Sequence, residues 1–419
     1  MKLMFCIQDP SYENSKYLHE TLLAECAECV VGAGAYAFAS KDGINLFFED
    51  DNFKKFMENG TYTLVVGTDD ITNENAINAL IALKNKYNSH LQIKAYIHSG
   101  KGSTFHPKFS WFKKSNGGTI VLGSGNLTQK GLRYNREAYN VAYHNEEEMK
   151  AILVEWEKWF NHSEPFLFDV EEPIVMEKAR LNTKKIRAVC EVKAELVRLQ
   201  DRSNIESELS GIYGTQPKNR KPVIRNIINE SEVGSIETNR DDTSIITDED
   251  IDVDSSYWII TNDSPVLIAE IPRSGNRWKQ ANFDRETFEH YFGATCGENG
   301  EYRILLKNVN TDGSLKKTEV RPSVSVSSQN YRFELEAASG LEYPEGAHRP
   351  IAIFAKVSCR DFIYELLMPG EANYTRVQEF IKETPVSVNR VRRLRYNARE
   401  VIERIPNLAI WKRIEEEEL

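Results

Sequence analysis

The sequence contains no apolar run that approaches the roughly 20 residues of a membrane-spanning helix. Its first residues soon become polar, and they lack the apolar core and cleavage pattern of a secretory signal peptide. The six cysteines are scattered along the chain in mostly apolar surroundings, which favours reduced thiols over a disulfide framework. These absences predict a cytoplasmic protein without a membrane partner.

Metal-binding motifs are also scarce. Cys26 and Cys29 form a Cys-x-x-Cys motif, but no second pair of cysteines accompanies it. A structural zinc site needs more ligands than one such pair provides. The sequence therefore favours buried thiols over a zinc site and predicts no metal or other cofactor.

Positive charge is in deficit, with a formal net charge of −10 over 419 residues. This excludes a protein whose whole surface carries positive electrostatic potential, but it allows a local basic patch that binds nucleic acid. The charge is uneven, because the stretch Glu237–Asp254 holds eight acids and one arginine. One hypothesis is that this acidic run occupies a DNA-binding groove as a mimic and restrains the resting protein. Arginines gather near the C-terminus, at positions 390, 392, 393, 395, 399 and 404.

The chain has no internal repeat, and its length favours two or more domains. Strand-like and helical segments alternate over residues 1–168, which predicts an α/β sandwich domain. A helical and acidic linker is expected at 169–255. Short alternating segments with turn residues, beginning with a strand at 256–262, predict a mainly-β antiparallel barrel or sandwich at 256–384. A helical tail at 385–419 completes the expected organisation.

One stretch, "FHPKFSWFKKSNGGTIVLGSGNLTQKGLRYNREAYNV", concentrates polar residues around two apolar runs. His106 and Lys108 are two apart on an expected strand from Phe105 to Phe112, so their side chains should project together. An imidazole beside an ammonium suits an anionic substrate, because the lysine neutralises phosphate oxygens while the histidine attacks phosphorus or moves a proton. The alternative is a surface strand with an incidental histidine.

A Gly123-Ser124-Gly125-Asn126 turn follows the second apolar run and should lead into a helix from about Leu127. Backbone N–H groups in such a turn, aided by a helix dipole, approach anions closely. Asn126 adds an amide donor and Ser124 a hydroxyl group. Glu137, on a further strand, is expected to hold the second ring nitrogen of His106 and fix its tautomer.

His-x-Lys followed by Gly-Ser-x-Asn resembles the pattern of the phospholipase D superfamily, and the resemblance covers roughly residues 60–145. It implies that His106 attacks a phosphodiester covalently, that Lys108, Asn126 and Ser124 bind the phosphate, and that a second histidine protonates the leaving oxygen. The superfamily often has an acid five positions after the lysine, where this chain has Lys113. The segment with Glu137 as its acid resembles instead the branch of metal-independent restriction endonucleases.

Only one His-x-Lys is present, since none of the other seven histidines begins such a motif. A two-histidine mechanism then requires a homodimer with one composite site on its two-fold axis. His98, just before the motif, either lines the site or is a structural histidine.

In that restriction-enzyme branch a β-barrel similar to plant B3 DNA-binding domains follows the nuclease domain, and residues 256–384 match it in strand count and length. The segment "IPRSGNRWKQANF" supplies residue types that contact bases and phosphates, or else it is a solvated loop anchored by one tryptophan. The candidate DNA-binding residues are Arg273, Asn276, Arg277, Trp278, Lys279, Gln280 and Asn282. Arg303, Lys307, Lys316, Lys317 and Arg321 either add phosphate contacts or are ordinary surface residues. The arginines near the C-terminus either touch DNA or pair with glutamates on a helix.

The sequence thus predicts a phospholipase D-like α/β domain joined to a B3-like pseudobarrel, acting as a dimeric, metal-independent endonuclease on double-stranded DNA in restriction or defence. Two alternatives remain: a phosphodiesterase for lipid or another small phosphodiester, and a catalytically silent DNA-binding subunit of a defence complex.

Overall fold

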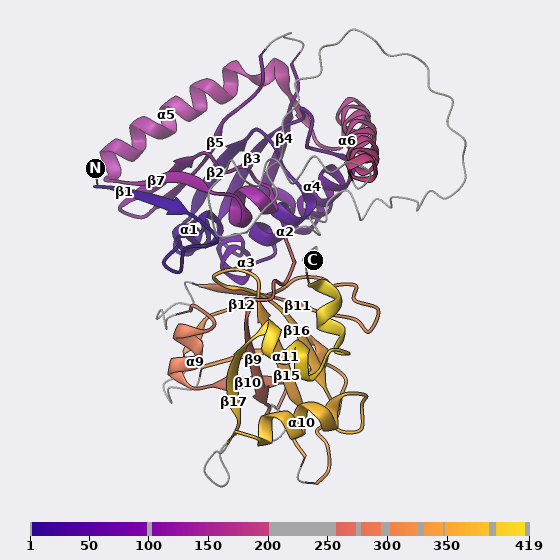
Figure 1. Ribbon diagram of the computed structural model, residues 1–419. Coiled ribbons are helices and arrows are strands. Elements are labelled where there is room, and N and C mark those ends of the chain that lie inside the picture. The colour runs from indigo at the N-terminus through magenta and orange to yellow at the C-terminus, as the bar shows by residue number, and fades with distance from the viewer. Residues whose placement is uncertain are drawn as a thin grey trace, which may run out of the picture.

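The computed structural model describes residues 2–98, 103–200, 257–273, 278–294, 302–325, 331–346, 348–384 and 391–414. Within them the chain forms an N-terminal and a C-terminal half, each built on its own sheets, which lie one above the other in Figure 1. The acidic run Glu237–Asp254 lies outside the described residues. No helix in the described ranges is long and apolar enough to cross a membrane.

The N-terminal half contains one eight-stranded mixed sheet. Its strands are β1 (Lys2–Gln8), β2 (Val31–Tyr36), β3 (Thr61–Gly67), β4 (Leu91–Tyr96), β5 (Lys108–Lys114), β6 (Gly117–Gly123), β7 (Glu137–His144) and β8 (Leu167–Asp169). Their order across the sheet is β1-β7-β6-β5-β2-β3-β4-β8, with β2, β3 and β4 parallel and the other neighbours antiparallel.

Helices cover both faces of this sheet, which confirms the predicted α/β layering (Figure 1). They are α1 (Leu18–Cys26), α2 (Lys41–Phe48), α3 (Asp51–Met57), α4 (Glu74–Tyr87), α5 (Glu146–His162) and α6 (Pro173–Gln200). The first four and α6 pack on one face, and α5 packs on the other. Asn73 caps α4 as predicted by accepting a hydrogen bond from Ala76 N at 3.0 Å, and Asn145 and Glu148 form a capping box on α5.

The face that carries α5 is only partly covered. Met149 and Trp156 of α5 pack over Trp111 and Ile120, but alternate residues of the edge strand β1 remain open to solvent. The exposed fractions are 57% for Leu3, 63% for Phe5, 54% for Ile7 and, on β6, 53% for Leu122. Phe5 and Leu122 are both paired with Asn140 of β7, so these four apolar residues, called the apolar strip below, share one sheet face, with the polar Asn140 between Phe5 and Leu122.

The C-terminal half is a two-sheet β structure with an aromatic core. A six-stranded sheet has the order β12-β11-β16-β15-β9-β17, and a three-stranded sheet has the order β10-β14-β13. The strands are β9 (Pro265–Glu270), β10 (Gln280–Phe283), β11 (Arg303–Asn308), β12 (Glu319–Pro322), β13 (Val324–Ser325), β14 (Tyr331–Glu334), β15 (Ile351–Lys356), β16 (Asp361–Leu367) and β17 (Arg393–Asn397). Phe283, Phe292, Phe333 and Phe354 pack against one another in the core. The mainly-β prediction is confirmed, whereas the closed B3-like pseudobarrel stays a prediction.

Three details differ from the sequence analysis. The sheet is not purely antiparallel, because β11 pairs in parallel with β16. Residues 257–262 form no strand, and Ile260 makes only an isolated bridge to Ile414. The expected helical tail contains β17, which adds to the sheet beside β9, followed by α11 (Ala398–Arg404). Two further helices, α9 (Arg285–His290) and α10 (Tyr374–Lys382), flank the sheets. Pairing of β17 with β9 in the sheet determines the local structure of this segment.

Most of the arginines of this segment that the structure describes form ion pairs or hydrogen bonds within the chain. Arg393 donates to Asp284 at 3.0 Å and to the carbonyl oxygen of Asn282 at 2.6 Å. Arg404 pairs with Glu383. These contacts favour the structural interpretation of the cluster over phosphate binding.

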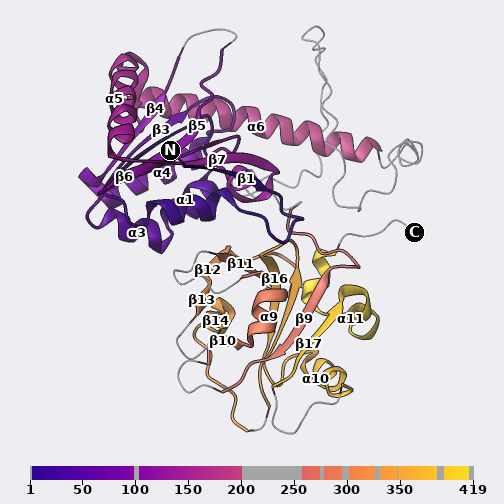
Figure 2. The same ribbon diagram turned by 90° about the vertical axis from the view of Figure 1, so that its left-hand side faces the viewer.

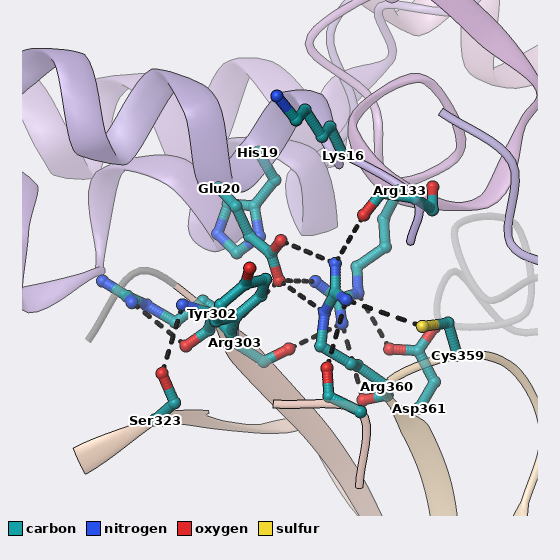
Figure 3. A network of polar contacts seen from close by, with 12 residues as sticks. Lys16, His19, Glu20, Arg133, Tyr302, Arg303, Ser323, Cys359, Arg360 and Asp361 are labelled. Carbon is teal, nitrogen blue, oxygen red and sulfur yellow. Dashed lines mark hydrogen bonds and ion pairs between the residues drawn. The ribbon is translucent and has the colours of Figure 1, made fainter. Parts of the chain in front are cut away.

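A buried ionic network joins the two halves, where the α1–α3 side of the upper half meets the ends of β11 and β16 (Figures 2 and 3). Arg133 is fully buried, and its Nε donates to Asp361 at 2.8 Å while NH1 lies 3.3 Å from Glu20. Arg360 donates to both carboxylate oxygens of Glu20, at 3.0 and 2.8 Å. Burial disfavours charge on Arg133, yet Asp361 and Glu20 raise the pKa of its guanidinium above the usual value.

Two basic residues that were candidates for DNA contact belong to this interface. Arg303 is buried and donates to Asp50 at 2.7 and 2.9 Å. Lys307 is buried with its ammonium 5.0 Å from the centre of the Trp258 ring, and burial lowers its pKa. Arg303 faces Asp50 of the N-terminal half, and Lys307 faces the buried ring of Trp258. Neither side chain is therefore placed to contact phosphates.

Candidate active site

The candidate catalytic residues meet at one edge of the N-terminal sheet. Since β5, β6 and β7 are successive antiparallel neighbours, the start of β5, the end of β6 and the start of β7 lie at the same edge. His106 precedes β5, Lys108 begins it, Ser124 and Asn126 follow β6, and Glu137 begins β7. The predicted grouping of these residues therefore has a topological cause.

The strand begins at Lys108 and not at Phe105 as expected. Pro107 has no N–H group to enter the ladder, and its carbonyl oxygen instead accepts from Ala37 N at 2.8 Å. His106 is exposed while Lys108 is buried. The strand is not a surface strand, because Ser110 and Phe112 are also fully buried.

The side chains of His106 and Lys108 are in direct contact. Lys108 Nζ lies 2.9 Å from His106 Nδ1 and 3.0 Å from Nε2, and it donates to the His106 carbonyl oxygen at 3.2 Å. An ammonium group can only donate, so a hydrogen bond from Lys108 to the ring needs an imidazole nitrogen that carries no proton. Burial lowers the pKa of Lys108, and the nearby charge of Glu137 partly offsets this. The pair supplies a positive charge and a lone pair within one small region.

Glu137 has different partners from those expected. Its carboxylate accepts hydrogen bonds from the Ser124 hydroxyl group and from Asn135 Nδ2, the latter at 3.0 Å. Ser124 in turn accepts from Ala138 N at 3.1 Å. The prediction that Glu137 holds His106 is thus not met within one chain, because the β6–β7 register brings Ser124 opposite the start of β7. Glu137 fixes the Ser124 turn instead.

Asn126 is oriented by a loop that the sequence analysis did not include. Phe38 N donates to Asn126 Oδ1 at 3.3 Å, which leaves the amide nitrogen as the donor for an anionic oxygen. Phe38 also sets its ring edge-on to His106, with ring centres 6.1 Å apart. Phe38 follows β2, a strand of small residues, and no charged or polar residue marked it as part of the site.

The turn after β6 does not lead directly into an α-helix. A five-residue π-helix, Lys130–Tyr134, begins only at Lys130, so the expected helix dipole at Asn126 is absent. Close packing shapes the turn instead, since a Cβ on Gly131 would lie 2.5 Å from Asn126 N. A larger residue at position 131 would displace Asn126.

His98 lies near the site. It lines the same hollow as His106, and its Nε2 is 3.4 Å from Asp69 Oδ2. The Cys26 and Cys29 thiols are buried and donate to the carbonyl oxygens of Leu23 and Glu25. Burial raises the pKa of Cys29 to about 12. Across the described residues no group of His, Cys, Asp and Glu side chains has the arrangement of a metal site.

The candidate DNA-binding residues are divided by the structure. Trp278 is buried and packs edge-on against Tyr343, with ring centres 5.4 Å apart, which fits an anchoring role. Arg273 lies over the same Tyr343 ring at 5.8 Å, and the backbone of Lys279 pairs with Leu335. Asn276 and Arg277 lie outside the described residues.

Gln280 and Asn282 extend from β10 on the smaller sheet of the C-terminal half. Gln280 donates to Glu334 at 3.2 Å and lines a hollow of about 270 Å³ that also contains Arg321 and Arg332. Side-chain oxygens of Gln280 and Asn282 are buried without a hydrogen-bond partner. This hollow is the part of the C-terminal half where amide and guanidinium groups gather.

No family model matches the chain, and no curated protein matches it. Among solved structures, the chain is similar to NucT from Helicobacter pylori, with 12% identity over 40% of this chain and 99% of that chain and a TM-score of 0.29. It is similar to Nuc, a phospholipase D family member from Salmonella typhimurium, with 18% identity over 40% and 97% of the two chains and a TM-score of 0.29. Phosphatidylserine synthase from Haemophilus influenzae has 13% identity over 46% and 47% and a TM-score of 0.28. Such low scores carry no argument about activity, which rests on the residues of the site.

Proposed function

We propose that the chain is a phosphodiesterase of the phospholipase D type and, more narrowly, a metal-independent DNA endonuclease of restriction or defence. The observation that carries this proposal is the contact of Lys108 Nζ with both ring nitrogens of His106, at 2.9 and 3.0 Å. An unprotonated imidazole next to a buried ammonium group suits nucleophilic attack on a phosphodiester. Asn126 and Ser124 stand beside the pair on the adjoining turn.

Each residue of the proposed site has its own role in the reaction. A bound phosphate oxygen draws the Lys108 ammonium away from the ring, which frees the His106 lone pair. The nitrogen then forms a bond to phosphorus while the bond to the leaving oxygen breaks, and a second imidazole protonates that oxygen. Lys108 and the amide nitrogen of Asn126 stabilise the added negative charge. Water attacks the phosphohistidine, the second imidazole takes its proton, and His106 is restored.

The second imidazole is proposed to come from a second copy of the chain. The apolar strip of Leu3, Phe5, Ile7 and Leu122 supports this proposal, because exposed apolar residues that gather on one face mark association surfaces. Leu122 is two residues from Ser124, so a partner that covers the strip also approaches the site. Two copies related by a two-fold axis bury the same strip against itself.

The proposed substrate is double-stranded DNA, and the C-terminal half is its proposed reader. The hollow with Gln280 and Arg332 supports this assignment, since amide and guanidinium groups read base edges in a groove, whereas Arg321 in the same hollow is paired with Glu319 at 2.9 Å. Because the chain carries a net charge of −10, phosphate contacts are expected only at local surfaces such as this hollow.

Cleavage of plasmid DNA in the presence of EDTA tests the proposed function. Wild-type protein is expected to nick or linearise the plasmid as well with the chelator as without it, because Lys108 and Asn126 provide the charge stabilisation. His106→Ala is expected to be inactive under both conditions. Loss of cleavage in EDTA, or equal cleavage by His106→Ala, would refute the proposal. Cleavage of a phospholipid but not of DNA would favour the lipid phosphodiesterase.

A lysine in the apolar strip tests the dimer. Phe5→Lys is expected to convert a particle of twice 48.1 kDa into a single chain, because the charge would be buried in the interface. Cleavage should fall at least ~100-fold, since the exposed strip contributes to assembly and the site needs both copies. Mass photometry and plasmid cleavage measure the two effects.

The matched control is Leu341→Lys, which changes an exposed leucine of the C-terminal half. It should leave both mass and cleavage unchanged. If Phe5→Lys stays dimeric and active, the strip is not the interface, and a monomeric yet active wild-type protein would contradict the shared site altogether.

A further inference from the structure

An open hollow of about 540 Å³ adjoins the proposed nucleophile, and His106 forms part of its wall. The other lining side chains are mainly aromatic and come from three separate segments: Tyr96 at the end of β4, Phe105 before β5, and Trp159 and Phe166 in and after α5. Its volume falls within the about 300–1,000 Å³ of small-molecule sites. Any group that fills the hollow lies directly beside the reacting phosphate.

The aromatic rings of the hollow form a nearly parallel series. Tyr96 stacks on Phe105 with ring centres 4.2 Å apart and planes at 15°. Phe105 stacks on Trp159 at 6.2 Å and 20°, and Tyr96 stacks on Phe166 at 5.8 Å and 29°. Such a series ends in flat apolar faces on which another flat ring can continue the stack.

Part of this series is ordinary core, because Phe105 is buried and packs with Ala35 and Val65. The two ends of the series, Phe166 and Trp159, are less buried. Phe166 is 38% exposed, and Trp159 is partly exposed although it packs against the same core. Burial of these aromatic surfaces would stabilise the fold, so their exposure next to a reaction centre needs another explanation.

Polar groups stand at the rim. His98, Ser103 and Thr104 line the same hollow. His98 Nε2 is buried and lies 3.4 Å from Asp69 without a hydrogen-bond partner. The hollow thus offers flat apolar faces together with the hydroxyl groups of Ser103 and Thr104, whereas the buried His98 Nε2 faces Asp69. A nucleobase, flat and with polar edges, has the matching chemistry.

We propose that this hollow binds the unstacked base of a nucleotide next to the phosphate that His106 attacks, so that the substrate at the cut is single-stranded or locally unpaired DNA. The inference rests on the proposed function for the placement of the phosphate, but base binding itself does not require cleavage. A base within a duplex is covered by its neighbours on both faces and must leave the stack to reach Phe166 and Trp159. That step costs least at a mismatch or in a single strand.

The test measures binding of short labelled oligonucleotides by the full chain in the His106→Ala background, where cleavage cannot intervene. A single strand is compared with the same strand carrying one abasic nucleotide, and both with the duplex. Addition of Phe166→Ala is expected to weaken binding of the intact single strand roughly 5- to 150-fold, the loss of one base–aromatic contact. It should not change binding of the abasic strand. Phe166→Tyr, which keeps the ring, should restore affinity.

Tyr12→Ala is the matched control, because Tyr12 is also an exposed aromatic residue but lies away from the hollow. An equal effect of Phe166→Ala on intact and abasic strands, or none on either, would overturn the inference. If the wild type cleaves plasmid and Phe166→Ala has no base-dependent effect, the inference fails while the proposed function stands. If base-dependent binding is found but no cleavage occurs, the hollow is a base site in a protein of another activity.

Discussion

A dimer with one wild-type chain and one His106→Ala chain is expected to retain far less than half of the wild-type cleavage rate. In the proposed site one imidazole bonds to phosphorus and the other protonates the leaving oxygen. A mixed dimer has a single imidazole and lacks one of these steps. Loss of one general acid costs about 10²–10⁴-fold, and the His106→Ala homodimer should lose about 10⁴-fold or more.

The experiment uses two affinity tags to purify the mixed dimer and compares initial rates of plasmid nicking. A mixed dimer of wild-type and Tyr12→Ala chains serves as the control and should have full activity. About half of the wild-type rate in the His106→Ala mixed dimer would mean that each chain works alone, with a histidine such as His98 supplying the proton. Acid-labile, base-stable label on the wild-type protein after incubation with substrate would report the phosphohistidine itself.

The grouping of the catalytic residues was predictable because it depends on local pattern and strand order. His106, Lys108, Asn126 and Glu137 each stand at the end of a short apolar run, and successive antiparallel strands bring such ends to one edge of a sheet. The contact between Lys108 and His106 follows from their separation of two residues. Both features can be predicted from the local sequence, without knowledge of the contacts that the rest of the chain makes.

Their partners were not predictable in the same way. Glu137 bonds to Ser124 because of the register between β6 and β7, and Asn126 is held by the backbone of Phe38. Neither contact leaves a signature in the spacing of residues. The stack of Tyr96, Phe105, Trp159 and Phe166 also leaves no signature in the spacing of residues. Each of these residues, taken alone, has the sequence context of an ordinary core aromatic.

For basic residues of the C-terminal half, charge alone does not indicate whether a side chain is free to contact DNA. Arg303 and Lys307 stand on either side of three apolar residues of β11, and their separation of four residues places them on one face of the strand. Both are buried, because that face meets the N-terminal half, where Asp50 compensates the charge of Arg303. Sequence shows a surplus of arginine and lysine but not which of them has an acidic partner far along the chain.

Replacement of Arg133 by methionine is expected to destabilise the folded protein by about 3–5 kcal/mol, the usual cost of removing one partner from a buried ionic group. Arg133 is fully buried, and the π-helix that carries it follows the catalytic turn and contacts the C-terminal half through Arg133 and through Tyr134, which stacks on Tyr257. Methionine fills most of its volume but leaves Asp361 without its guanidinium partner and removes one partner of Glu20. Urea unfolding followed by circular dichroism measures the shift of the midpoint.

Arg136→Met provides a matched control three residues further along the chain. Arg136 also pairs with an aspartate, Asp9, at 3.0 Å, but 56% of its side chain is exposed. Water screens that pair, so its loss should cost less than about 1 kcal/mol. A second comparison is Tyr257→Phe, which removes the hydrogen bond to Asp361 at 2.6 Å and should cost about 1–3 kcal/mol. The expected order of destabilisation is therefore Arg133→Met, then Tyr257→Phe, then Arg136→Met. If Arg133→Met and Arg136→Met shift the midpoint equally, the buried network does not stabilise the junction between the halves, and the catalytic turn is held by its own half alone.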